Sequence, residues 1–164
     1  MTITAPWLNS YEDVPSSLDY PDCSMAKMVL NAADKYPEIT AYDFFNCKQS
    51  YNAFADEIRL CARGLLAVEI KKGDRVTICM PNTPQAVIVF YALNLIGAVA
   101  NMVHPLSAEE ELVSYINNSN SVAVLTLDQF ASKLETILPR TKVGMLILAG
   151  ADDGLKGIKK PLTD

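Results

Sequence analysis

The chain has 164 residues, of which 50% are hydrophobic and 20% are charged, and its formal net charge is −5. This length is enough for one domain with its own core, and the composition excludes a disordered or fibrous protein. The acidic balance excludes the clustered Lys and Arg surface that nucleic-acid binding requires, so we expect no nucleic-acid partner.

Residues 1–22 are predicted to form an extended N-terminal arm. The arm holds acidic residues and no Lys or Arg, so it lacks the basic start and the apolar core of a secretory signal peptide. Turn-forming Pro and Ser residues separate its aromatic rings, which belong to Trp7, Tyr11 and Tyr20. We expect these rings to hold the arm on a surface.

A single α/β subdomain is predicted over residues 23–150, beginning with a helix from the N-cap Ser24 to Tyr36. Pro37 ends this helix. Its apolar residues recur at helical spacing and predict one buried face: Met25, Met28, Val29, Ala32 and Tyr36.

A β-hairpin is predicted next, from strand-forming residues over Thr40–Phe45 and Gln49–Tyr51 with a turn at 46–48. We expect it either to extend one edge of the main sheet or to form a small second sheet. Asn52 is the predicted N-cap of the following helix. The buried stripe of that helix is predicted to consist of Phe54, Ile58, Cys61, Ala62 and Leu65.

The run from Thr77 to Ala108 contains no formal charge and lies between charged turns. Such a run is either a membrane span or a buried strand–helix–strand unit. A spanning helix needs about 20 consecutive apolar residues, and the prolines, asparagines and Gly97 divide this run into shorter pieces. We therefore expect no transmembrane segment.

The capping and helix-breaking residues in this run also predict where the elements of the unit begin and end. Thr83 is the expected N-cap of its helix, Pro84 occupies the first helical position, and Gly97 follows the last. Because this helix is apolar on nearly all sides, it belongs in the centre of the fold. The three predicted elements are a strand over 75–80, a helix over 84–96 and a strand over 98–103.

The remaining elements continue the alternation of strands and helices. Ser107 and Glu110 form a predicted capping box for a helix whose buried side holds Leu112, Tyr115 and Ile116. A strand over 122–127, a helix that Asp128 caps and Pro139 ends, and a strand over 143–149 complete the series. This pattern predicts an α/β fold with a mainly parallel sheet and helices on both faces. Residues 151–164 are interpreted as a tail that leads toward a further region.

The four cysteines form no C-x-x-C pair and there is one histidine, so no zinc site is expected. Cys61 and Cys79 lie in apolar runs and are interpreted as small core residues. A reduced, cytoplasmic protein is the natural interpretation.

The sequence offers few candidates for chemistry. No glycine-rich phosphate loop is present, and the helix start at Thr83 lacks one donor because Pro84 has no N–H. His104 follows the carboxyl end of a predicted strand, where ligands gather in open α/β sheets, and is the one candidate for the wall of a substrate cleft. Asp152 and Asp153 are interpreted as a solvated turn, because a receiver-type acidic pair would follow the first parallel strand instead.

An ordered set of phrases resembles the N-terminal part of the AMP-forming acyl-CoA synthetases, the adenylate-forming ligase family, over roughly residues 24–150. The phrases are Pro37-Glu38-Ile39-Thr40-Ala41, Ser50-Tyr51, Arg63-Gly64-Leu65, Ile70-Lys71-Lys72-Gly73-Asp74-Arg75-Val76, Met80-Pro81-Asn82-Thr83-Pro84, Phe90-Tyr91-Ala92, Leu95-Ile96-Gly97-Ala98-Val99, Pro105-Leu106 and Glu109-Glu110. Within the family, His104-Pro105-Leu106-Ser107 resembles the fatty acyl-CoA ligases more than the amino-acid-activating domains.

The resemblance implies a two-step reaction in the parent enzyme: ATP and a carboxylate, here a fatty acid, give an acyl-adenylate and pyrophosphate, and the sulfur of CoA then displaces AMP. It also implies Mg²⁺ on the triphosphate. The family's phosphate loop, nucleotide-binding motifs and catalytic Lys lie downstream of this region, so no catalytic, cofactor-binding or metal-binding residue is carried over to this chain.

Two interpretations follow. The first is an N-terminal fragment of a fatty acid–CoA ligase, a scaffold that is inactive alone and whose partners are the missing downstream ligase domains. The second is a free-standing α/β binding or interaction domain without catalysis. Apolar surface that a partner domain would cover also predicts self-association.

Overall fold

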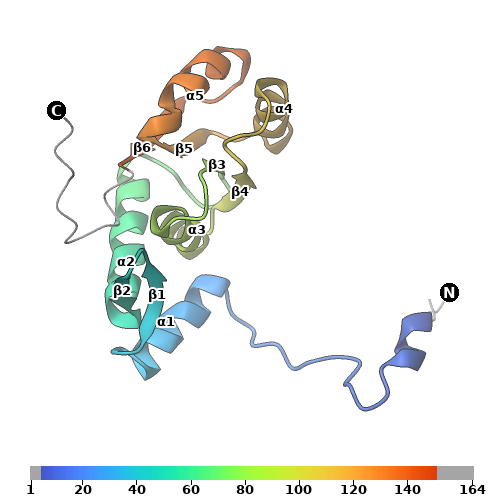
Figure 1. The fold of residues 1–164 in the computed structure, drawn as a ribbon. Coiled ribbons are helices and arrows are strands. Elements are labelled where there is room, and N and C mark those ends of the chain that lie inside the picture. The colour runs from blue at the N-terminus through green and yellow to red at the C-terminus, as the bar shows by residue number, and fades with distance from the viewer. Residues whose placement is uncertain (1–4, 151–164) are drawn as a thin grey trace.

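The structure is a computed structural model that describes residues 5–150. Its centre is a sheet of four parallel strands in the order β4-β3-β5-β6 (Figure 1). The strands are β3 (Arg75–Cys79), β4 (Val99–Val103), β5 (Ala123–Leu127) and β6 (Met145–Ala149). The predicted α/β fold and parallel sheet are confirmed, and each strand begins or ends within two residues of its predicted limits.

Helices cover both faces of this sheet, as predicted. One apolar core joins the sheet to α2 (Tyr51–Ala67) and α3 (Pro84–Ile96), and a second joins it to α4 (Glu109–Ser119) and α5 (Ala131–Ile137). The chain runs outward from β3 to β4 and then back across β3 to β5. Crossovers of one handedness must change face when the chain reverses direction, which explains why α3 and α4 lie on opposite faces.

The limits of α3 follow from its predicted caps. The Thr83 side chain accepts a hydrogen bond from the Ala86 N–H, and Gly97 closes the helix in the left-handed region with φ 78°. The helix can be apolar all round because one side packs on the sheet and the other contacts α2 and α1 (Met25–Lys35).

The hairpin forms a separate two-stranded antiparallel sheet, which is one of the two predicted arrangements. Its strands are β1 (Thr40–Phe44) and β2 (Cys47–Ser50), so the predicted strand start at Gln49 and end at Tyr51 are wrong. Phe45 and Asn46 both have positive φ, 48° and 63°, and this two-residue turn matches the twist of a hairpin.

Two predicted helix starts are also wrong. The N-cap of α2 is Ser50, whose hydroxyl accepts from the Ala53 N–H, and not Asn52. The N-cap of α4 is Ala108, and its N–H donates to Glu111, so the capping box predicted from Ser107 does not form. In both cases the strand or turn before the helix fixes the backbone of the N-cap residue, and the helix starts directly after that residue.

The predicted apolar face of α1 is buried only in part: Val29 packs against the core, but Tyr36 is exposed. Ser24 caps the helix as expected, but the buried residues are Ala26 and Ala33, while Met25 and Met28 are 51% and 49% exposed. The Asn94 side chain of α3 accepts a hydrogen bond from the Ala26 N–H at 2.8 Å. This close approach of α1 to α3 favours small residues at the contact.

Three short 3-10 helices complete the described part of the chain: η1 (Pro6–Ser10), η2 (Asp128–Phe130) and η3 (Leu138–Arg140). Asp128 accepts from the Gln129 N–H within η2, one turn before α5, rather than capping α5 itself. Within residues 5–150 no helix is long and apolar enough to cross a membrane.

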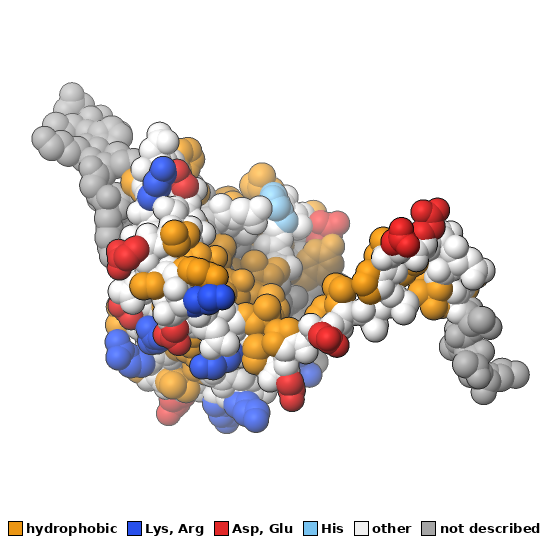
Figure 2. All heavy atoms as spheres, turned by 90° about the horizontal axis from the view of Figure 1, so that it is seen from below, with side chains coloured by type: hydrophobic (Ala, Val, Ile, Leu, Met, Phe, Trp, Pro, Cys, Tyr) orange, Lys and Arg blue, Asp and Glu red, His pale blue; other side chains and the backbone are white. Residues whose placement is uncertain are grey.

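The N-terminal arm projects away from the body (Figure 1). Of the three rings expected to hold it on a surface, Tyr11 is half-buried, whereas Trp7 is 59% and Tyr20 80% exposed. Figure 2 shows acidic side chains along the arm and hydrophobic patches on the body where the arm leaves it. The division into an arm over 1–22, a subdomain over 23–150 and a tail over 151–164 stays a prediction, and the tail, with Asp152 and Asp153, lies outside the described residues.

Candidate functional site

The carboxyl edge of the parallel sheet is the candidate site, because ligands in open α/β sheets bind where neighbouring strands lead to opposite faces. Strand β3 leads to α3 on one face, whereas its neighbours β4 and β5 lead to α4 and α5 on the other. The residues that follow the four strands therefore lie along this edge: Asn82, His104, Asp128 and Gly150.

His104 lies at the rim of a groove of about 580 Å³ between β4 and α4. Its Nδ1 accepts a hydrogen bond from the Leu106 N–H at 3.2 Å, which fixes the ring over the turn that follows β4. From α5, the Lys133 ammonium donates to the carbonyls of Pro105 (3.0 Å) and Ser107 (2.5 Å) and holds the same turn. His104 is thus exposed beside a hollow, and its role in a substrate cleft stays a prediction.

A hydroxyl and amide network reaches this groove through Asn101 and Ser119, which line it. Thr77 and Ser121 are buried, and their hydroxyl oxygens lie 2.8 Å apart. The Asn101 amide donates to Thr77 (3.0 Å) and Ser119 (3.1 Å), and Ser119 and Ser121 are 2.8 Å apart. The sequence analysis missed these residues, because single hydroxyls that are far apart in the chain carry no motif.

Gln85 was also missed. It lies in the first turn of α3 and is only 8% exposed, and its Nε2 donates to the Gly150 carbonyl at 3.0 Å. Its Oε1 is buried without a hydrogen-bond partner among the described residues. Gln85 therefore joins the start of α3 to the residue that follows β6, at the carboxyl edge of the sheet.

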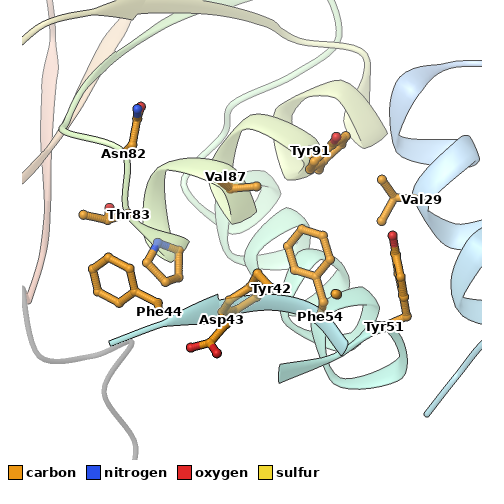
Figure 3. Close-up of a pocket in the computed structure, with 12 residues that line it drawn as sticks. Val29, Tyr42, Asp43, Phe44, Tyr51, Phe54, Asn82, Thr83, Val87 and Tyr91 are labelled. Atoms are coloured by element: carbon orange, nitrogen blue, oxygen red, sulfur yellow. The ribbon is translucent and has the colours of Figure 1, made fainter. Parts of the chain in front are cut away.

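A second hollow, of about 330 Å³, lies between the hairpin, α1 and the start of α3. Figure 3 shows the Tyr51 and Tyr91 rings at one end and Phe44 beside Thr83 at the other, with the Asp43 carboxylate pointing away from α3. This hollow is mostly apolar.

Aromatic contacts give the hollow its wall. Phe54 makes edge-to-face contacts with Tyr42 (5.4 Å between ring centroids) and Tyr91 (5.9 Å). The Tyr42 hydroxyl donates to Glu57 at 3.1 Å, and burial together with the Glu57 charge raises the pKa of Tyr42 above its ordinary value. The phenol therefore stays protonated and remains a donor.

The start of α3 at the carboxyl edge offers few free N–H groups to a phosphate. Pro84 has no N–H, and the N–H groups of Ala86 and Val87 are already bonded to Thr83. Within residues 5–150, no group of three or more His, Cys, Asp or Glu side chains is arranged to hold a metal ion.

The four cysteines are free thiols. Cys79 is buried and Cys61 half-buried, and burial raises the pKa of each thiol to about 11. Neither thiol is activated as a nucleophile, which agrees with their interpretation as core residues.

The fold is an open parallel α/β sheet covered by helices on both faces, and sequence comparison identifies the family. The family model described as AMP-binding enzyme matches residues 29–161. The chain therefore belongs to the AMP-binding enzyme family, as its resemblance to the AMP-forming ligases predicted.

Two of the curated relatives that match are named long-chain-fatty-acid–CoA ligases. The chain is 28% identical over 162 residues to a long-chain-fatty-acid–CoA ligase of Bacillus subtilis, and 31% identical over 162 residues to one of Yersinia pestis. Each alignment covers 96% of this chain but only 29% of the relative. The chain thus spans less than a third of the length of these relatives and corresponds to their N-terminal part.

Solved structures confirm the fold. A long-chain-fatty-acid–CoA ligase from Archaeoglobus fulgidus superposes with a TM-score of 0.76 at 24% identity, over 84% of this chain and 29% of that one. A fatty acyl-CoA synthetase from Mycobacterium tuberculosis gives a TM-score of 0.73 at 25% identity, over 86% and 30%.

Proposed function

We propose that this chain is the N-terminal scaffold of an AMP-forming ligase that joins a long-chain fatty acid to CoA. The observation that carries the proposal is the family match over residues 29–161, together with curated relatives that are named long-chain-fatty-acid–CoA ligases. In this proposal ATP, Mg²⁺ and CoA bind to the parts of the ligase that lie outside this chain, and the chain alone is inactive.

The scaffold has two tasks in this proposal. It presents the carboxyl edge of its sheet to the downstream ligase domains, which are its partners, and it supplies His104 to the wall of the fatty acid cleft. The groove of about 580 Å³ beside His104 supports the second task. A cytoplasmic location is part of the same proposal, because four free thiols suit a reducing compartment.

A chimera tests the proposal. The chain replaces the matching N-terminal part of the Bacillus subtilis relative, and fatty acid-dependent exchange of pyrophosphate into ATP is measured. We expect exchange from the chimera and none from the chain alone or from the truncated relative alone. A chimera that melts cooperatively yet shows no exchange contradicts the scaffold role, and exchange by the chain alone contradicts its inactivity. His104→Ala in the active chimera should raise the KM for the fatty acid more than it lowers kcat.

The alternative is a free-standing binding domain. The hollow of about 330 Å³ favours a binding domain, because residues of this chain alone line it and form its aromatic wall. Titration of the isolated chain with palmitate, followed by tyrosine fluorescence, separates the two functions. Saturable binding that Tyr91→Ala removes supports the alternative, and the absence of binding supports the scaffold.

A further inference from the structure

Strand β4 is an open edge of the main sheet. The Val99 N–H donates to the Asp74 carbonyl at 2.8 Å, and the register pairs Val99 with Arg75 in parallel. Backbone groups of a strand point alternately to its two sides, so residues 99, 101 and 103 bond to β3. The N–H and C=O groups of Ala100 and Met102 therefore point away from the sheet, and no described residue pairs with them.

Natural edge strands are usually protected by charges, prolines, bulges or a covering element. Strand β4 has the sequence Val-Ala-Asn-Met-Val, without a charge or a proline, and its pairing with β3 is regular over all five residues. Among residues 5–150, no other strand pairs with its free side. Val99 and Met102 are each 49% exposed. The groove of about 580 Å³ runs beside this edge, between β4 and α4.

We propose that the β4 edge binds the β4 edge of a second copy of this chain, as an antiparallel pair about a two-fold axis. The two copies then share one continuous sheet of eight strands. This proposal concerns the chain itself and does not depend on the ligase function. It gives the expected self-association a defined surface.

The sequence of β4 is suited to such a pair because it reads almost the same in both directions. A register with Asn101 opposite the partner's Asn101 places Ala100 opposite the partner's Met102 and Val99 opposite the partner's Val103. In an antiparallel pair, opposite residues whose backbone groups face each other exchange both hydrogen bonds. Ala100 and Met102 are the outward-facing residues, so this register pairs every open group of both.

Charge and packing also favour a second copy. No formal charge occurs between Thr77 and Ala108, so the two-fold axis brings no like charges of the strands together. Helices α3 and α4 both contact β4, one on each face. The axis therefore places each of them beside its equivalent, with Tyr115 of α4, which borders the groove and is 44% exposed, available to pack across it.

The opposite edge, β6, is the competing surface. The backbone groups of residues 145, 147 and 149 point away from the sheet there, as those of Ala100 and Met102 do at β4. It also offers a matched control, because Leu148 on β6 has the same 49% exposure as Met102 on β4.

The test is the mass of the 164-residue chain by size-exclusion chromatography with light scattering. We expect a dimer for the wild type, a dimer for Leu148→Lys, and a dissociation constant raised about tenfold or more for Met102→Lys, because the register brings two ammonium groups close together. A monomeric wild type overturns the proposal, as does a dimer that Leu148→Lys weakens and Met102→Lys does not.

Hydrogen exchange of the wild type tests the register without any substitution. The amides of Ala100 and Met102 should become protected as the concentration rises, whereas the Met145 and Ile147 amides of β6 should not change. A concentrated dimer whose Ala100 and Met102 amides still exchange rapidly contradicts the β4 pairing, even if Met102→Lys fails to fold.

Discussion

Replacement of Gly97 by Ala should destabilise the chain, because this residue ends α3 in the left-handed region. The N–H of Gly97 bonds to the Asn94 carbonyl and the N–H of Ala98 to the Leu93 carbonyl, the two bonds of a Schellman motif. At φ 78° a residue with a Cβ is strained. The added Cβ would also lie 2.9 Å from Cγ of Lys72.

The expected loss of stability follows from two effects, the left-handed backbone and the close approach of the added Cβ to Lys72. Left-handed backbone costs an L-residue about 1–2 kcal/mol. The Lys72 side chain is exposed and flexible, so it can move away at little further cost. We therefore expect Gly97→Ala to lower the free energy of unfolding by about 1–2 kcal/mol, and Gly97→Asn to lower it less, since Asn tolerates this region better.

Urea unfolding followed by circular dichroism measures the effect, at one fixed protein concentration because association shifts apparent stability. Gly64 provides the control: it lies within α2, is exposed, and has no atom within 4 Å of an added Cβ. Gly64→Ala should raise the free energy of unfolding by about 0.5–1 kcal/mol. Equal effects of the same sign at Gly97 and Gly64 would refute the reasoning from backbone conformation.

Three further substitutions test the core. Thr77→Val removes a hydroxyl that bonds to Ser121 and accepts from Asn101, and should cost about 1–3 kcal/mol in urea unfolding; an unchanged midpoint would show that the network does not stabilise the fold. Burial raises the pKa of the Cys79 thiol to about 11, so its contribution to stability is complete below the unfolded thiol's pKa, about 8.5, and is lost as the pH rises through 11. Cys79→Ala should therefore reduce the decline of the free energy of unfolding at high pH. The same pH dependence of stability in the variant and the wild type would contradict the raised pKa. Tyr42→Phe removes the donor to Glu57 and should lower the melting temperature, with a cost of about 1 kcal/mol; a stabilised variant would contradict this bond.

Sequence reasoning located α3 accurately because signals at both ends agree. Thr83 and Pro84 mark its start, Gly97 marks its end, and the apolar run between them leaves no alternative. The start of α2 was misplaced because Ser50 and Asn52 are both good N-caps, and only the hairpin register, which places Ser50 at the end of β2, decides between them.

The orientation of α1 could not be predicted from periodicity. Its larger apolar residues suggest one buried face, yet the contact with α3 is made at Ala26, whose N–H bonds to the Asn94 side chain. Small residues are favoured where two helices approach closely, and the spacing of apolar residues does not indicate which helices do so. The exposed Met25 and Met28 are the result.

The candidate site was predicted only in part. His104 was placed correctly at the carboxyl edge because its position after a strand is visible in the sequence. The network of Thr77, Asn101 and Ser119 was not, because it depends on which strands are neighbours. That order, with β5 beside β3 rather than beside β4, is a property of the whole sheet.

The central position of β3 has a consequence for synthesis on the ribosome. Strand β4 follows β3 closely, but the other side of β3 pairs with β5, where Thr126 lies 47 residues after its partner Cys79. At about 5–20 residues per second, roughly 2–10 s pass between the synthesis of these two residues. During that time one side of β3 is unpaired, and Arg75 is the only charged residue of this strand. The nascent chain is therefore most prone to aggregate before its fifth strand is made.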